Sequence, residues 1–436
     1  GLFTGTPPYV WISNQAGNNG VLFGDLNVRA VKDKNDNIIS DGRPSLGFTG
    51  NMDTYKPAEG SATRSDIAIT DPDFKYPSLW KSNIAADYKF GDGWVATVEL
   101  LYSKDINAIY HDNIGLYRTE QFVNDGGAGN ARPYYNGYYS DREGNQKAAN
   151  HVVMLRNTSK GHSLYTTFQL QKNFVDGILK GLYLNGSYSF GQSRGVTDGT
   201  SSVATSAWKY RAALDGNAEE VGYTAGSFDG RLLFSASYTA NWSKYAATSF
   251  GLIYQRYRPF RYSYCYNGDA NGDSQFSNDL MYIPANFDEV KDHLLPGDFD
   301  SQEDAWKAMN AFIEQDPYLS KHRGEYAERN GAVAPFANQL DLSVSHDIKI
   351  YQKNGRSHTL RFSFNIANFL NLLNRNWGVV QTTVLGNQQY QFLTIPKGQG
   401  PSAANNYTLK YTMAKDLDET FKDNLNDVSR WQMQFG

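Results

Sequence analysis

Hydrophobic and polar residues alternate along several long stretches of this chain. Between residues 231 and 242 the even-numbered positions are apolar or aromatic, whereas most odd-numbered positions are Ser, Thr or Asn. A period of two places successive side chains on opposite faces of a β-strand. A second alternating run starts after only three residues, at 246, so the two runs predict a β-hairpin.

The same hairpin design occurs three more times. Gly91-Asp92-Gly93, residues 175–177 and Asn354-Gly355 supply turn residues between alternating runs, and Asp-Gly and Asn-Gly are strong turn signals. The pattern therefore predicts at least eight long antiparallel strands. They are expected at residues 78–90, 94–110, 162–174, 178–191, 229–242, 246–260, 337–351 and 358–370.

The connections between these strands alternate in length. Short turns alternate with long polar segments at 111–161, 192–228 and 261–336. Strands of about 12–14 residues, tilted by about 45°, cross roughly the thickness of bilayer hydrocarbon, whereas soluble strands average about 5–6 residues. These features predict an all-β fold, an antiparallel transmembrane β-barrel with long extracellular loops. The alternative is a large secreted β-sandwich or β-helix, which leaves the alternation of long and short connections unexplained.

Aromatic residues support a membrane setting. Trp80, Trp94 and Trp242 lie near strand ends, where an interfacial girdle places them. The apolar face of the barrel, including Leu232, Phe234 and Tyr238, is expected to face lipid.

Outside the strands the pattern is weaker. Residues 1–77 are rich in Gly, Asn and Asp, which indicates a large extracellular loop region with a small hairpin near 33–37, and residues 78–436 hold the strands and their loops. Ser301, followed by acidic residues and by apolar residues at helical spacing up to Pro317, predicts one short loop helix. Short strands are expected at 389–395 and 407–413, with another beginning at Trp431.

Composition narrows the function. The 436 residues carry a formal net charge of −4, so no basic footprint for nucleic acid is present. Aromatic residues make up 14% of the chain, which favours strands. Cys265 is the single cysteine, which excludes an internal disulfide framework. No run of about 18 apolar residues is present, as a membrane-spanning helix requires. A mean hydropathy of −0.57 is compatible with a barrel, because only every second strand residue meets lipid.

One segment has the spacing of a cation-binding loop. Asp269, Asn271, Asp273 and Gln275 offer oxygen atoms at every second position, with a glycine between them, as in acidic calcium loops. Asp279 is the available closing carboxylate, one position earlier than a twelve-residue loop requires. These five residues are the candidate Ca²⁺ site, and the alternative is a solvated Asp/Asn/Gly turn.

Catalytic motifs are absent from the sequence. The seven histidines are scattered, and no Gly-x-Ser-x-Gly elbow, P-loop or dinucleotide fingerprint is present, so we expect no enzyme and no organic cofactor. Five polar residues of the strands could line a passage, but every barrel interior is polar, so simple solvation is the better interpretation. These residues are Gln169, Gln171, Asn185, Asp341 and Arg361.

Three longer segments carry a family resemblance: residues 269–284, 322–332 and 362–371, the last reading Phe-Ser-Phe-Asn-Ile-Ala-Asn-Phe-Leu-Asn. They resemble the C-terminal barrel half of Oar-like TonB-dependent outer-membrane receptors, and the likeness runs through most of the chain. The resemblance implies a 22-stranded barrel in the outer membrane of a Gram-negative bacterium. The family's N-terminal plug, TonB box and first strands are expected on the N-terminal remainder of the same protein.

The resemblance also implies a function. A transporter of this family would bind a large ligand through its extracellular loops and move it through a plugged lumen. Its partners would be outer-membrane lipid, the N-terminal remainder, TonB and a surface lipoprotein. The alternative function is a surface binding or adhesion protein anchored by the barrel, with loops 111–161 and 261–336 as the working parts. A passive porin is disfavoured, because such long loops occlude a pore.

Overall fold

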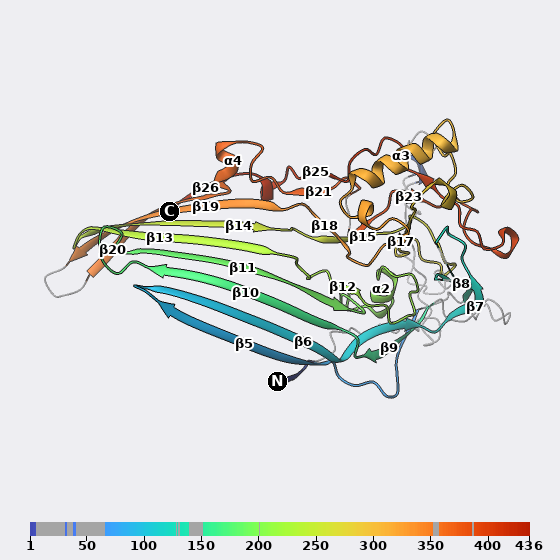
Figure 1. The fold of residues 1–436 in the computed structure, drawn as a ribbon, viewed down its shortest axis with the longest axis horizontal. Coiled ribbons are helices and arrows are strands. Elements are labelled where there is room, and N and C mark those ends of the chain that lie inside the picture. The colour runs from blue at the N-terminus through green and yellow to red at the C-terminus, as the bar shows by residue number, and fades with distance from the viewer. Residues whose placement is uncertain are drawn as a thin grey trace, which may run out of the picture.

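The computed structural model describes a β-rich protein with long strands at one end and loops at the other (Figure 1). Most of the loops gather where the long connections lie, and the short turns lie at the opposite end. The structure describes residues 1–5, 31–32, 38–40, 66–127, 129, 131–138, 151–199, 201–351, 357–385 and 388–436.

Eight long strands form the main sheet, and each is antiparallel to its neighbours in the order of the chain. Their number, order and direction confirm the prediction from the alternating pattern. The strands are β5 (Ser78–Phe90), β6 (Trp94–Asn113), β10 (His162–Asn173), β11 (Leu182–Gly195), β13 (Arg231–Ser243), β14 (Ala246–Tyr257), β19 (Ala337–Tyr351) and β20 (Ser357–Ala367).

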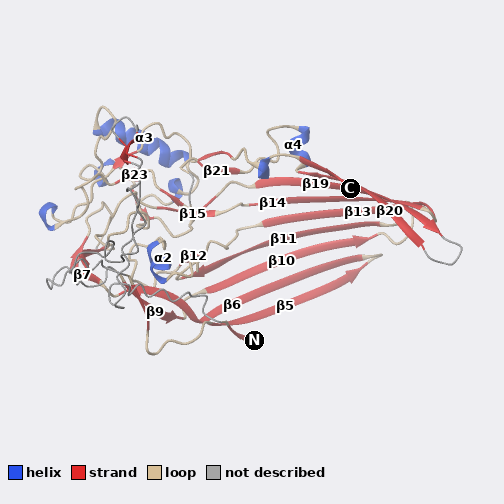
Figure 2. Ribbon diagram, turned by 180° about the vertical axis from the view of Figure 1, so that it is seen from behind, coloured by secondary structure: helices blue, strands red, loops and turns tan. Residues whose placement is uncertain are grey.

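The sheet has two edges in the described part of the chain. Strand β1 (Leu2–Thr4) pairs with the first residues of β5, and β26 (Gln432–Phe435) pairs with the last residues of β20. The rest of the outer edge of β5 has no strand beside it among the described residues. The view from behind shows the same open, curved sheet (Figure 2).

Register aligns the apolar side chains across the strands. Val98 of β6 lies opposite Phe168 of β10, which lies opposite Tyr188 of β11, and Tyr188 lies opposite Leu232 of β13. Their neighbours in sequence point to the other face of the sheet and are polar, as with Thr167. Rows of this kind make one face apolar and the other polar.

Several predicted strand boundaries differ from the structure, and two of these differences have a clear local cause. Residues 178–181 form a turn, so β11 begins at Leu182 rather than at 178. Strand β20 ends at Ala367, because Asn368 adopts a left-handed backbone (φ 52°) and a short helix follows. That helix, α4 (Phe369–Leu373), occupies the end of the predicted strand 358–370. Its Phe-Leu pair fits a strand face and a helix equally well.

The prediction of one short loop helix is incomplete. The expected helix is α3 (Gln302–Gln315), and Asp304 donates its backbone N–H to Ser301 Oγ at 3.1 Å, the bond of an N-cap. The structure adds α4 and also α2 (Ala204–Lys209), which is too short to show a periodic pattern. Among the described residues, none of the helices has both the length and the apolar composition needed to span a bilayer.

Short strands organise the remaining segments. Two pairs are parallel, β4 with β9 and β15 with β22, so the antiparallel prediction holds for the main sheet but not for every pair. Strands β2 (Val31–Lys32) and β3 (Ile38–Ser40) pair antiparallel around 33–37, where the small hairpin was expected and where residues lie outside the described part. The others are β4 (Ile67–Thr70), β7 (Leu116–Phe122), β8 (Pro133–Tyr138), β9 (Val152–Thr158), β12 (Gly222–Tyr223), β15 (Arg261–Tyr264), β16 (Tyr282–Ile283), β17 (Glu325–Tyr326), β18 (Ala332–Val333), β21 (Gln381–Thr383), β22 (Gln389–Tyr390), β23 (Leu393–Thr394), β24 (Thr412–Met413) and β25 (Phe421–Asp423).

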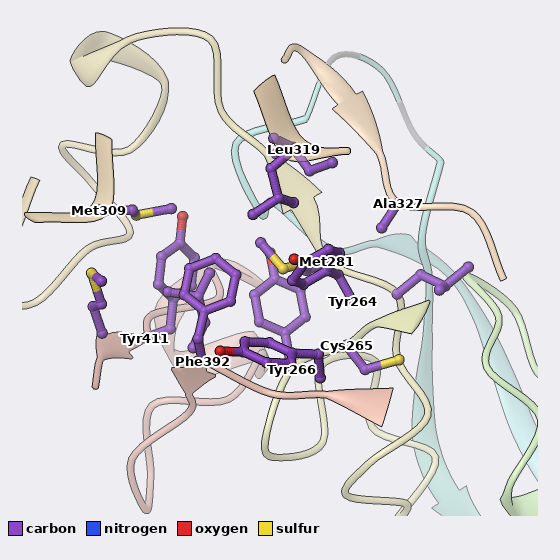
Figure 3. Packing of buried hydrophobic residues seen from close by; sticks show 14 of the residues in the cluster. Tyr264, Cys265, Tyr266, Met281, Met309, Leu319, Ala327, Phe392 and Tyr411 are labelled. Carbon is purple, nitrogen blue, oxygen red and sulfur yellow. The ribbon is translucent and has the colours of Figure 1, made fainter. Parts of the chain in front are cut away.

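The largest buried core lies in the loop region, which we define as the described residues of 116–161, 201–228, 261–336 and 389–421. Aromatic side chains from distant parts of the sequence meet there, including Tyr266, Phe392 and Tyr411 (Figure 3). Helix α3 adds Phe312, whose ring centroid lies 4.7 Å from that of Phe392. The long segments were predicted as polar loops, and this is wrong for 261–336, which supplies much of the core. We call this cluster the loop core.

Candidate functional site

Three carboxylates of the predicted cation loop converge between β15 and β16. Asp269, Asp273 and Asp279 each place one carboxylate oxygen within 4.8 Å of the others. Asp273 and Asp279 are almost completely buried. Folding therefore brings together the three acidic residues among the five that the sequence singled out.

Backbone hydrogen bonds shape the loop around Asp269. Its carboxylate accepts from the N–H of Gly272 at 2.6 Å and from the N–H of Ser274 at 2.8 Å. Gly272 has φ +83°, and a Cβ there would stand 2.0 Å from the carbonyl oxygen of Tyr135. Only glycine fits this turn, because a side chain would collide with the neighbouring backbone.

Asn271 and Gln275 take part through the same turn. The Oδ1 atom of Asn271 accepts from the Asp273 N–H at 2.9 Å, and its Nδ2 donates to Asp273 Oδ2 at 3.3 Å. The backbone N–H of Gln275 donates to Asp273 Oδ1 at 2.8 Å. Asp273 is therefore held in place by both neighbours.

Asp279 closes the cluster although it comes one position early for a helix–loop–helix calcium site. The next residue, Leu280, forms a bridge with Cys265, which turns the chain back toward the start of the loop. The Ala270 N–H then donates to Asp279 Oδ2 at 2.8 Å. Because the chain here returns along a strand and does not enter a helix, a carboxylate at position 279, one residue early, can close the loop.

Arg132 is a member of the site that sequence reasoning missed. Its side chain is fully buried and forms ion pairs with Asp279 (3.2 Å) and Asp125 (3.0 Å), and it also donates to the carbonyl of Leu280. Burial alone would lower the pKa of Arg132, but Asp125 and Asp279 more than offset it and raise the pKa. The guanidinium therefore stays charged. Arg132 lies 147 residues from Asp279 in the sequence, so no local spacing could have indicated the pair.

The cluster carries more negative than positive charge. Burial raises the pKa of Asp279 to about 7, in spite of the opposing effect of Arg132. Burial also raises the pKa of Asp273 well above its ordinary value, and that of Asp269 less strongly. Buried carboxylates must be neutralised by protons, by basic side chains or by a cation. Clustered carboxylate oxygens are ligands that Ca²⁺ prefers.

The polar residues considered for a passage lie on the polar face of the sheet and bond to their neighbours. Gln169 Nε2 donates to Asn185 Oδ1 at 2.7 Å, and the hydroxyl of Tyr183 donates to Gln171 Oε1 at 2.7 Å. Two more bonds complete the set: the Asn368 N–H donates to Asp341 Oδ1 at 2.7 Å, and Arg361 donates to Asp347 Oδ1 at 2.6 Å.

The chain has a distant structural likeness to a known protein. No family model matches the chain, and no curated protein matches it. Among solved structures, it is similar to the outer membrane transporter YddB from Escherichia coli, with a TM-score of 0.36 and 10% sequence identity over 74% of this chain. The chain spans 32% of the length of that transporter.

Proposed function

We propose that the chain is part of an outer-membrane barrel that acts as an Oar-like, TonB-dependent receptor and transporter. The observation that carries this proposal is the apolar face of the main sheet. Eight strands align apolar side chains in register, and many remain exposed, such as Ile84 (71%) and Phe168 (48%). Exposed apolar patches of this extent mark contact with protein or lipid. Strand length and the short and long rims favour lipid.

Closure of the barrel requires additional strands. The outer edge of β5 beyond Trp80 is unpaired in the described part of the chain. Each unsatisfied backbone group in hydrocarbon costs several kcal/mol, so a spanning sheet cannot keep such an edge. In our proposal, strands from the N-terminal remainder of the same protein complete a 22-stranded barrel around a plug. The loop region then lies outside the cell.

The candidate Ca²⁺ site stabilises the loop region in this proposal. Asp269, Asp273 and Asp279 bind the cation, which offsets their buried charge, and Asn271 holds Asp273 in position. The supporting observation is the excess of buried carboxylates over the single guanidinium of Arg132.

A surface binding or adhesion protein anchored by the barrel is the second candidate function. The loop core favours it, because a loop region with its own buried core can present a binding surface without any transport. If the full-length protein bound its ligand but did not bind the periplasmic domain of TonB, this result would favour a surface binding protein anchored by the barrel. Binding to TonB, and loss of ligand uptake when TonB is deleted, would favour the transporter.

Labelling tests the position of the two sheet faces. Phe234→Cys and Thr239→Cys place a thiol on the apolar and the polar face of β13, and both positions are exposed. Cys265 can remain, because it is fully buried and burial raises the pKa of its thiol. A fluorescent label at 234 should be quenched by spin-labelled lipid, and a label at 239 by aqueous iodide. Equal quenching of both labels by iodide would contradict a lipid-facing sheet.

A further inference from the structure

A polar pocket of about 420 Å³ lies beside β15, and Ser277 of its lining belongs to the cation loop while the other lining residues come from elsewhere in the chain. Strand β15 pairs with β18 on one side and with β22 on the other, and this brings distant segments together around it. Six of its lining residues offer polar groups or an aromatic ring: Asp198, Tyr210, Ser263, Arg329, Asn330 and Gln389. The volume falls in the range of about 300–1,000 Å³ typical of small-molecule sites.

Asn330 organises the wall of this pocket. It has a left-handed backbone (φ 52°), which asparagine tolerates better than most residues. Its N–H donates to Ser263 Oγ at 2.8 Å, and its Nδ2 donates to Asp198 Oδ2 and to the Tyr223 carbonyl, both at 2.9 Å. These bonds fix three lining groups before any ligand arrives. A ligand therefore need not order them.

The pocket contains one positive and one negative side chain. Arg329 is 3% exposed, and its terminal nitrogens donate to the carbonyls of Gly195, Val196 and Gly222. The carboxylate of Asp198 accepts from Asn330 and from the N–H of Ala225 at 3.0 Å. Asp198 would repel an anionic ligand, and Arg329 would repel a cationic ligand. The balance favours a neutral ligand.

The groups left over after these bonds are hydrogen-bond acceptors and hydroxyls, together with the buried Nε of Arg329, a donor that has no hydrogen-bond partner. Gln389 uses its Nε2 to donate to the Tyr210 carbonyl at 3.1 Å, which leaves its Oε1 as an acceptor. Asn330 likewise uses its nitrogen and keeps Oδ1. Ser263 accepts from Asn330, so its hydroxyl proton remains to be donated. A ligand that offers several hydroxyl groups matches this set, because each hydroxyl both donates and accepts.

Tyr210 adds an aromatic surface. Its side chain is 65% exposed while it lines the pocket. An aromatic ring with a polar tip suits a ligand that has both C–H surfaces and hydroxyl groups.

We propose that this pocket binds a neutral carbohydrate, a monosaccharide unit or a short saccharide. The inference goes beyond the outer-membrane role, because binding at the pocket does not require transport or TonB. A binding measurement can therefore show no sugar binding while the barrel assignment stands. Sugar binding can likewise be observed even if the barrel assignment is wrong.

Saturation-transfer NMR of the protein in detergent tests the proposal. The probes are glucose, galactose, mannose, maltose, cellobiose and lactose, with glucuronate and glucosamine as charged counterparts. At least one neutral sugar should give saturation transfer that titrates to a plateau, and the charged counterpart should bind at least about fivefold more weakly. Absence of binding by all six neutral sugars, or equal binding of the charged ones, would overturn the proposal.

Matched variants locate the binding. Tyr210→Ala and Asp198→Asn should each weaken the neutral sugar about tenfold, because each removes a contact within the pocket. Tyr76→Ala is the control, since Tyr76 is equally exposed (66%) but lies outside this lining. The control should bind as the unaltered protein does. Circular dichroism reports whether each variant is folded. Unchanged binding in both pocket variants would place the sugar elsewhere and overturn the assignment.

Discussion

The main sheet and the loop region treat their apolar side chains in opposite ways. On the sheet, Phe168 and Phe234 are 48% and 37% exposed, whereas Phe312 and Phe392 in the loop core are 1% and 0% exposed. The same residue type therefore faces outward in one region and inward in the other. The sheet must find its apolar environment outside itself, and the loop region provides its own.

Polar groups show the reverse contrast. Those of the sheet bond to one another on an open face, as Thr167 and Ser189 do at 2.9 Å. In the loop core, Asp316 is completely buried and accepts from the Tyr264 hydroxyl (2.7 Å) and the Thr420 hydroxyl (2.8 Å). A lost polar contact is therefore replaced by water on the sheet but not in the loop core.

The largest expected effect comes from truncating one aromatic side chain in each region. Phe312→Ala should lower the free energy of unfolding of the loop region by about 3–5 kcal/mol, because it leaves a cavity in the loop core. Phe234→Ala on the sheet should cost less, about 1.5–2 kcal/mol, because it loses contact with lipid or detergent but leaves no cavity in a packed core. Urea titration in detergent, with hydrogen exchange to separate the two regions, measures both. Equal losses would remove the contrast.

Asp316 tests the buried polar centre of the loop core. Asp316→Ala should cost about 2–4 kcal/mol, because it strands two hydroxyls and two backbone N–H groups away from water. Asp418→Ala, at an exposed position nearby, should be close to neutral. The same urea titration compares them. A neutral Asp316→Ala would show that water reaches this centre.

Protonation of the acidic cluster should stabilise the loop region, whereas removal of the cation should destabilise it. Burial raises the pKa of Asp279 from 3.8 to about 7, so folding favours its protonated form. That stabilisation is complete below about pH 4 and is lost as pH rises through about 7. Without divalent cations, the loop region should lose about 2 kcal/mol between pH 5 and pH 7.

Calcium should restore this stability at pH 8, and Asp279→Asn should flatten the pH dependence. Hydrogen exchange of the loop amides, with calcium or with a chelator, provides the measurement. A stability that does not respond to calcium at pH 8 would contradict a cation at this cluster.

The smallest expected effect concerns the start of α3. Ser301→Ala removes the N-cap bond to Asp304 and should cost about 1 kcal/mol. Lys307→Ala, at an exposed position of the same helix, should change stability by less than about 0.5 kcal/mol. Thermal unfolding followed by far-UV circular dichroism distinguishes them. If both variants were neutral, packing of α3 against the loop core alone would determine its stability.

The sequence predicted the sheet well because its strands have one apolar and one polar face. That contrast produces a period of two, as at residues 231–242, and short turns fix the pairing. The loop core gives no such signal. Residues 261–266 are buried on both sides, so their pattern carries no exposed face, and α2 has only six residues.

The candidate site was predictable only as far as it is local. Asp269, Asn271 and Asp273 lie close in sequence, and their spacing alone indicated a cation loop. Arg132 and Asp125 reach the same place from far away through the fold. The sugar pocket is likewise built from separated segments, and no spacing in the sequence indicated that its residues would meet.

The loop core joins segments that lie far apart in the sequence, and this separation determines when the core can form. Gln391 donates its side-chain amide to the Tyr266 carbonyl across 125 residues, and strands β19 and β20 lie between them in the chain. Hairpins close through neighbouring residues, whereas this contact requires a long chain to be brought back first, which slows folding. We therefore expect the loop core to pack only after the β19–β20 hairpin has formed. Until then, chaperones and proteases have access to its tyrosine side chains.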